Sequence, residues 1–88
     1  MLNGCGKKGL AREIRNLLIH KGFDVLSFDN AQKFLYKKTV IIIRKMDYDK
    51  FNLLRKEVPV KKVYQQINEQ SIYDFTIIIG KDYKMLFN

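Results

Sequence analysis

The chain has few of the residues from which disulfides and metal centres are built. It contains a single cysteine, Cys5, and a single histidine, His20, among 88 residues. One cysteine excludes an internal disulfide, and one cysteine with one histidine cannot supply the usual ligands of a zinc cluster. We therefore expect no metal site and no cofactor.

Long hydrophobic runs are also missing. No segment approaches the roughly 18–20 consecutive apolar residues of a membrane-spanning helix, and the first residues lack the apolar stretch of a signal peptide. We expect the segment to be soluble. Any targeting signal or membrane anchor is expected upstream of Met1, in a longer parent protein.

Acidic residues are scarce relative to basic ones. There are 9 Asp and Glu against 17 Lys and Arg, which gives a net charge of +8 and favours an anionic partner. The basic residues are dispersed, however, and a lysine-rich composition also arises without selection for binding, so both interpretations stay open. A chain of 88 residues that is 47% apolar is expected to form one small folded domain, spanning residues 1–88.

The most informative motif is a glycine-rich loop near the start of the chain. Its three glycines have the spacing G-x-G-x-x-G at the entrance of a predicted helix. Glycines permit a tight turn and a close backbone approach, and the N–H groups at a helix start attract anions. Basic side chains lie inside the loop and on the following helix. The candidate anion-binding residues are Asn3, Gly4, Gly6, Lys7, Lys8, Gly9, Arg12 and Arg15.

Hydrophobic spacing predicts the elements of the first third of the chain. Apolar residues at helical spacing predict a helix over 10–21, which Gly22 ends. Aromatic and aliphatic residues predict a strand over 23–28. This strand is expected to end in a turn at residues 29–30, because Asp and Asn favour turns.

Two later segments consist mainly of β-branched residues. Residues 39–43 and 75–79 each predict a strand, and the continuous run at 39–43 indicates a strand that is central or covered on both faces. Residues 31–38 form a basic, aromatic-bearing connection before the first of them. Residues 80–83 lead out of the second.

A second helix is predicted between these two strands. Asp47 or Asp49 can cap its start, and Pro59 ends it. Its buried face is expected to consist of Phe51, Leu54 and Val58. Residues 60–67 fit either a helical turn or a short edge strand protected by lysines, and 68–71 form a polar loop.

This order of elements predicts an α/β fold. It is a βαββαβ-like order, typical of a two-layer sandwich with a mixed sheet and helices on one face. The first strand is truncated to residues 1–3, which leaves an incomplete place in the sheet through which a fragment can dimerise. The expected core residues are Ile14, Leu17, Val40, Ile42, Ile77 and Ile79.

Several motifs occur together in a fixed order. The chain opens with N-G-x-G-x-x-G-L-A at residues 3–11, continues with Gly22-Phe23 and a β-branched strand, and carries G-x-D at residues 80–82. This combination resembles the LytR C-terminal domain family across nearly the whole chain. The chain departs from the family in having Cys5 where a small polar residue is more usual, in its short first strand, and in its high lysine content.

The resemblance implies a function in the cell envelope. Domains of this family often follow a LytR-CpsA-Psr catalytic domain and an upstream membrane anchor, and they are understood as accessory binding domains without established chemistry. For this chain, the resemblance implies an extracytoplasmic, non-catalytic domain. Its expected partner is an anionic envelope glycopolymer or an envelope protein.

Two other functions remain as alternatives. Asp29 lies 20 residues after Gly9, where a dinucleotide-binding fold places its ribose-binding carboxylate, although the chain is too short for two mononucleotide halves. Non-specific nucleic-acid binding is suggested by the net charge and by interleaved aromatics, but the best strands carry Val and Ile instead of exposed rings, so no specific nucleic acid is expected. The aromatics are Phe34, Tyr36, Tyr48, Tyr64 and Tyr73.

The sequence offers no catalytic constellation. His20 has no serine or aspartate partner by spacing and is expected at an exposed helix end, where a cation is favoured. Asp47 and Asp49 are better explained as helix caps than as a carboxylate pair. Cys5 can be activated by a helix start and neighbouring lysines, but it lacks a base. We therefore assign no catalytic residue and expect no enzymatic activity.

Overall fold

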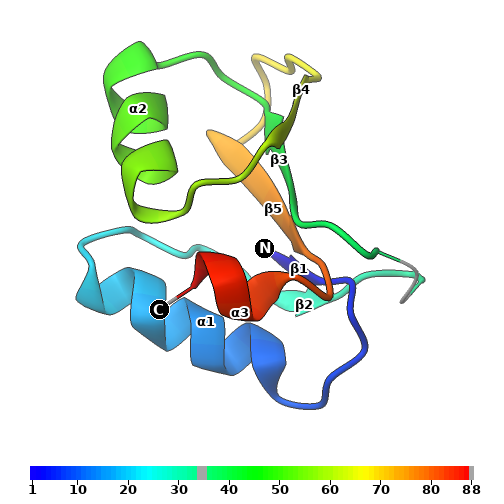
Figure 1. Cartoon of the computed structure of the whole chain (residues 1–88). Helices are drawn as coiled ribbons and strands as arrows, with labels where there is room; N and C mark the ends of the chain where they lie inside the picture. Colours follow the sequence, from blue (N-terminus) through cyan, green and yellow to red (C-terminus); the bar gives the residue numbers. More distant parts are fainter. Residues whose placement is uncertain (34–35, 88) are drawn as a thin grey trace.

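The elements follow one another in the order of a strand, a helix, two strands, a helix, two strands and a helix, and the computed structural model describes residues 1–33 and 36–87 (Figure 1). The first half contains β1 (Leu2–Asn3), α1 (Leu10–His20), β2 (Asp29–Asn30) and β3 (Val40–Ile43). The second half contains α2 (Tyr48–Glu57), β4 (Lys62–Gln65), β5 (Phe75–Ile79) and α3 (Tyr83–Leu86). The α/β class, both predicted helices and both β-branched strands are confirmed.

The strands form one mixed, five-stranded sheet in the order β2-β1-β5-β3-β4. β1 is parallel to β2 and to β5, β3 is antiparallel to β5, and β4 is parallel to β3. α1 joins β1 to β2, because parallel neighbours need a crossover connection. The truncated first strand is confirmed, since β1 lies inside the sheet but contains only 2 residues.

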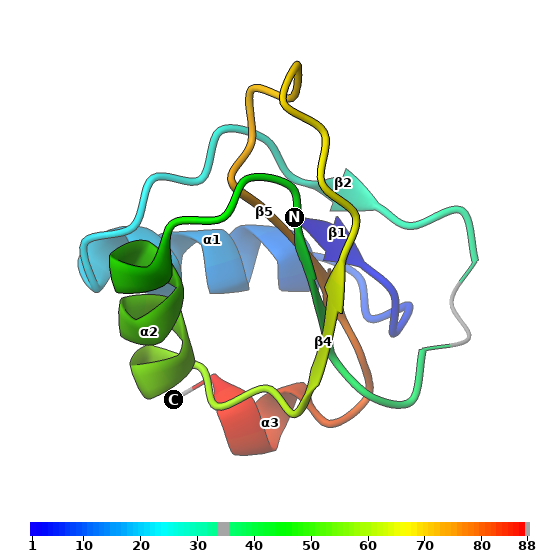
Figure 2. The same cartoon turned by 90° about the horizontal axis from the view of Figure 1, so that it is seen from above.

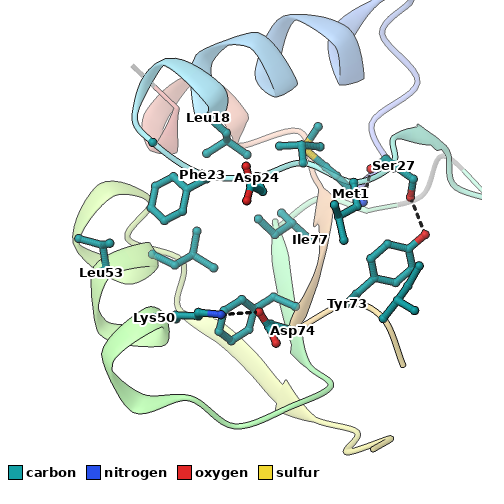
Figure 3. Close-up of a pocket in the computed structure, with 16 residues that line it drawn as sticks. Met1, Leu18, Phe23, Asp24, Ser27, Lys50, Leu53, Tyr73, Asp74 and Ile77 are labelled. Carbon is teal, nitrogen blue, oxygen red and sulfur yellow. Dashed lines mark hydrogen bonds and ion pairs between the residues drawn. The ribbon is translucent and has the colours of Figure 1, made fainter. Parts of the chain in front are cut away.

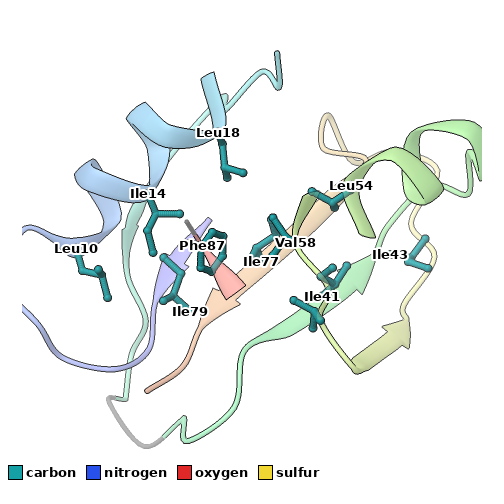
Figure 4. Packing of buried hydrophobic residues seen from close by; sticks show 11 residues of the cluster. Leu10, Ile14, Leu18, Ile41, Ile43, Leu54, Val58, Ile77, Ile79 and Phe87 are labelled. Atoms are coloured by element: carbon teal, nitrogen blue, oxygen red, sulfur yellow. The ribbon is translucent and has the colours of Figure 1, made fainter. Parts of the chain in front are cut away.

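α1, α2 and α3 lie on one face of the sheet, as predicted (Figure 2). Alternate side chains of β3 and β5 point to these helices and form the core with them (Figure 4). The core residues are Leu10, Ile14, Leu18, Ile41, Ile43, Leu54, Val58, Val60, Ile77, Ile79 and Phe87. We call the opposite side the open face, and its residues are Val40, Ile42, Lys62, Tyr64, Thr76 and Ile78.

The predicted orientation of β3 was wrong by one residue. Val40 and Ile42 were expected in the core, but Ile41 and Ile43 are almost fully buried there, while Val40 and Ile42 are half-buried on the open face. A run of β-branched residues without polar alternation does not specify which side faces the helices. The antiparallel register, in which Ile41 lies opposite Ile77, decides it. Leu17 is also only half-buried, at the margin of the core.

The strand predicted over 23–28 is absent, and that segment is irregular. Pairing begins where a turn was expected, at Asp29 and Asn30, which lie opposite Leu2 and Asn3 of β1. The reason is that β1 offers β2 only these two positions. The short partner strand therefore limits β2, although the composition of 23–28 suits a strand.

The other predicted segments are the edge at residues 60–67, the second helix and the connection over 31–38. The edge-strand interpretation of 60–67 is correct. β4 is the last strand of the described sheet, and it pairs with its neighbour β3. α2 starts as predicted, with the Asp47 carboxylate accepting a hydrogen bond from the Lys50 N–H at 3.1 Å. α3, which begins after Asp82, was not predicted. Of the predicted connection over 31–38, residues 34 and 35 lie outside the described part of the chain, and so does the aromatic side chain of Phe34.

Candidate functional site

The glycine-rich loop leaves the central strand β1 at its carboxyl end and leads into α1. Gly6 and Gly9 have φ angles of 84° and 77°, in the left-handed region that other residues adopt only with strain. Gly9 is the residue before the helix, and its carbonyl accepts the hydrogen bond of the Glu13 N–H at 3.2 Å. These two glycines are therefore needed for the backbone path of the loop itself.

The side chain of Asn3 stabilises this loop through hydrogen bonds to the backbone of the loop. Its side chain is 2% exposed, its Nδ2 donates to the Lys7 carbonyl at 2.7 Å, and its Oδ1 accepts from the Cys5 N–H at 3.1 Å. Both ends of the amide are thus engaged inside the loop. Asn3 belongs to the site as a positioning residue, and a ligand would meet the exposed residues above it.

Gly4 has a packing role. Its N–H donates to the Ile79 carbonyl at 2.9 Å, and its carbonyl accepts from the Tyr36 N–H at 3.2 Å. A Cβ atom at this position would lie 2.6 Å from the Tyr36 ring and 2.9 Å from the Ile78 side chain. Glycine is required here because two neighbouring segments close on the backbone.

The basic candidates separate into two groups. Lys7, Lys8 and Arg12 are exposed on the loop and the first turn of α1. The Lys7 ammonium lies 5.5 Å from the centre of the Tyr83 ring, and hydrogen bonding with the Tyr83 side chain is the main cause that raises the pKa of Lys7. Arg15 points elsewhere, because its guanidinium packs 5.4 Å from the Phe28 ring centre. Lys7, Lys8 and Arg12 therefore remain candidates at the start of α1, whereas the Arg15 guanidinium packs against Phe28.

Further lysines that the sequence analysis missed lie on loops tied to this one. The Tyr36 N–H bonds to Gly4, and the Tyr36 carbonyl accepts from the Lys81 N–H at 3.0 Å. These bonds link the glycine-rich loop to the segment before β3 and to the segment after β5. Exposed basic residues on the linked segments are Lys37, Lys38 and Lys81. The tertiary structure brings these segments next to the glycine-rich loop. The spacing of the lysines along the chain therefore gave no signal for them.

The G-x-D motif at residues 80–82 has a structural role. The Asp82 carboxylate accepts hydrogen bonds from the Thr39 N–H at 2.8 Å and from the Thr39 hydroxyl at 2.7 Å. The same hydroxyl accepts from the Gly80 N–H at 3.0 Å. A Cβ atom on Gly80 would lie 2.6 Å from the Lys38 carbonyl oxygen. The motif thus fastens the start of β3 to the end of β5.

At the other end of the sheet, an apolar groove of about 420 Å³ lies between α1, α2 and the start of β5 (Figure 3). Leu18, Phe23 and Ile77 line it, and exposed apolar side chains lie at its margin: Leu26, Leu53 and Ile72. Its polar groups are largely paired with each other. Lys50 forms an ion pair with Asp74 at 3.2 Å, and the Ser27 hydroxyl bonds to the Tyr73 hydroxyl at 3.0 Å.

Over residues 1–33 and 36–87, no three His, Cys, Asp or Glu side chains gather as metal ligands would. In the same described ranges, no helix has the length and apolar character that crossing a bilayer requires. Cys5 is half-buried, and His20 is exposed at the end of α1. Asp29 is exposed, and its Oδ1 accepts a hydrogen bond from the neighbouring Asn30 N–H at 2.7 Å.

The fold and the loop together define a small two-layer α/β domain that exposes a basic glycine-rich turn at one end of its sheet. The family model LytR_C, described as LytR cell envelope-related transcriptional attenuator, matches residues 1–83. The chain therefore belongs to this family, as its motifs indicated. The family is an accessory, cell-envelope-related one and is not known as catalytic. No curated protein and no solved structure shows significant similarity to the chain.

Proposed function

We propose that this domain is a non-catalytic, extracytoplasmic binding module that recognises an anionic envelope polymer through its glycine-rich loop. The observation that carries the proposal is that Lys7, Lys8 and Arg12 are all exposed on the loop and the first turn of α1. The positive end of the helix dipole favours an anion at the same place, and the N–H groups after Leu10 are the ones that can contribute, because the Leu10 N–H donates to the Lys7 carbonyl at 3.3 Å. The parent protein would carry its membrane anchor upstream of this domain.

Affinity for one anionic group is expected to be weak. Lys7, Lys8 and Arg12 are exposed, so water and salt screen their charges. A polymer compensates for weak single contacts by presenting many anionic groups, which raises the effective concentration of the second group once the first has bound. This requirement favours a repeating envelope polymer over a small free anion.

The test is a titration of isotope-labelled domain with inorganic phosphate and with a short anionic glycan, followed by amide chemical shifts. Amides from Gly4 to Arg12 should move first, and Lys7→Glu combined with Lys8→Glu should abolish the response. The matched control combines Arg55→Glu with Lys56→Glu, two exposed basic residues of α2, and changes the net charge equally. Shifts spread evenly over all lysines, or equal losses in both double variants, would contradict a specific site.

Nucleotide binding is kept as a second candidate because the structure contains a parallel β1-α1-β2 unit around the glycine-rich loop. Asp29 lies on β2, next to β1, as a ribose-binding carboxylate would. All helices of the described chain lie on one face, whereas dinucleotide folds cover both. Adding ATP and NAD to the titration decides between the two. A nucleotide that binds far more tightly than phosphate, and loses this advantage in Asp29→Asn, would favour the second candidate.

Binding of an envelope protein is the other expectation that the family leaves open. The apolar groove is the surface for such a partner, because Leu26, Leu53 and Ile72 are each more than half exposed around it. Non-specific attraction of nucleic acid by net charge would show a steep salt dependence without sequence preference.

A further inference from the structure

The open face of the sheet carries a shallow hollow that none of the preceding functions uses. β3 and β5 supply its apolar floor, with Val40 and Ile42 on β3 and Ile78 opposite Val40 on β5. α1, α2 and α3 cover the other side of the sheet, so no helix protects this floor (Figure 2). The hollow has a volume of about 510 Å³ and is open to solvent, so a ligand would lie along the sheet and stay partly exposed.

Two tyrosines stand at opposite margins of this floor. Tyr64 comes from the edge strand β4, where it lies opposite Ile42, and it is 56% exposed. Tyr36 comes from the segment before β3 and is half-buried, with its backbone bonded to Gly4 and to Lys81. The sequence analysis found no exposed aromatic on the two best strands, because these rings are supplied by neighbouring segments.

The charges around the hollow have one sign. Lys37, Lys38 and Lys62 line it and are exposed, and none of the described residues that line it is acidic. Farther along the same face, the Arg44 guanidinium is held in place by Gln66 Oε1 at 2.7 Å and by Thr76 Oγ1 at 3.3 Å. The face therefore offers cations at both ends of an apolar, aromatic-bordered floor.

We infer that this hollow is a binding site for an anionic saccharide. A sugar ring has an apolar C–H surface, which fits the aliphatic floor and the face of a tyrosine, and its carboxylate or phosphate groups would pair with the lysines. A nucleic-acid single strand is less suited, because successive bases stack on successive exposed rings. In the described part of the open face, only the ring of Tyr64 is more than half exposed.

This inference does not rest on the glycine-rich loop being a ligand site. The two surfaces adjoin at Tyr36, which bonds to Gly4 with its backbone and lines the hollow with its side chain. One long polymer could reach both, since Lys37 and Lys38 lie on the segment that links the two surfaces. Lys62 and Tyr64, however, belong to the hollow alone. Substitutions on β4 therefore test the hollow without touching Lys7, Lys8 or Arg12.

The experiment titrates the labelled domain with a short oligogalacturonate and follows the methyl signals of Val40, Ile42 and Ile78. These signals should shift, and Tyr64→Ala or Lys62→Glu should each weaken binding about tenfold, as expected when one central contact is lost. Tyr48→Ala is the matched control for the tyrosine, because Tyr48 is 70% exposed on α2. Lys56→Glu is the control for the lysine. Melting temperatures establish that all four variants are folded.

Three further arms separate the alternatives. A neutral maltooligosaccharide of equal length should bind at least tenfold more weakly, and equal binding would overturn the role of the lysines. A thymidine oligonucleotide that binds more tightly than the uronate, with loss in Tyr64→Ala, would identify a nucleic-acid surface and overturn the saccharide assignment. Unshifted methyl signals with shifts confined to Gly4–Arg12 would disprove the hollow while leaving the glycine-rich loop as the binding site.

Discussion

The two faces of β3 are made of the same residue types but differ in what covers them, whereas on β5 the residues of the two faces, Ile77 and Ile78, are both 7% exposed. Ile41 and Ile43 are 0% and 1% exposed beneath the helices, whereas Val40 and Ile42, their neighbours on β3, are only half-buried on the open face. Apolar composition therefore does not distinguish a packed face from an accessible one. The helices distinguish them, since their apolar residues reach only one side.

The open face also differs in its neighbours. On the covered side, β4 contributes Val63, which packs against the core. On the open side, the same strand contributes Lys62 and Tyr64. A strand with one apolar side and one polar, aromatic side is typical of a sheet that faces the interior and solvent. Here the solvent side retains a small apolar floor of Val40, Ile42 and Ile78.

The largest predicted effect tests this contrast directly. Ile41→Ala removes a fully buried side chain and should lower the free energy of unfolding by about 2–5 kcal/mol. Ile42→Ala removes the same atoms from the open face and should cost clearly less. Urea unfolding of both variants measures the difference. Equal losses would mean that the open face is covered in solution, and a larger loss for Ile42→Ala would mean that the orientation of β3 is reversed.

Much of the fold was predictable because its signals are local. Apolar spacing located α1, Asp47 and Pro59 bounded α2, and β-branched runs located β3 and β5. The orientation of β3 was not predictable, because a run of Val and Ile lacks the alternation that marks a buried side. The extent of β2 was not predictable either. It depends on the two residues of β1, and the composition of residues 23–28 does not contain that limit.

The candidate site shows a similar division. The glycine-rich loop was recognisable, since the left-handed angles of Gly6 and Gly9 require glycine at those positions. The bonds of Asn3 to both sides of the loop and the contact of Lys7 with Tyr83 depend on tertiary structure. Tyr36 and Tyr64 lie 28 residues apart in sequence, and they border the same floor only through the order β5-β3-β4. A surface of this kind cannot be predicted without the strand order.

An intermediate effect is expected where β3 is fastened to β5, because this contact fixes the register that separates the two faces. Asp82→Ala leaves the N–H and the hydroxyl of Thr39 without their acceptor at a position that is 1% exposed. The loss should be about 1–3 kcal/mol, with faster hydrogen exchange at Val40. Glu69→Ala, an exposed acidic residue, is the control with the same charge change. If both variants unfold alike, Asp82 does not maintain the register.

The smallest predicted effect concerns Lys7, which connects the glycine-rich loop to α3 on the covered side. Hydrogen bonding with Tyr83 raises the pKa of Lys7 above its ordinary value of 10.5. The folded state holds this proton more tightly than the unfolded state. The contribution of the contact to folding stability is therefore complete below pH 10.5 and is lost as the pH rises through the raised pKa. Tyr83→Phe retains a ring but removes the hydroxyl, so the Lys7 ammonium should titrate at a lower pH in ¹⁵N-detected spectra. Tyr48→Phe should leave its titration unchanged, and an identical Lys7 curve in Tyr83→Phe would show that the hydroxyl does not reach the ammonium.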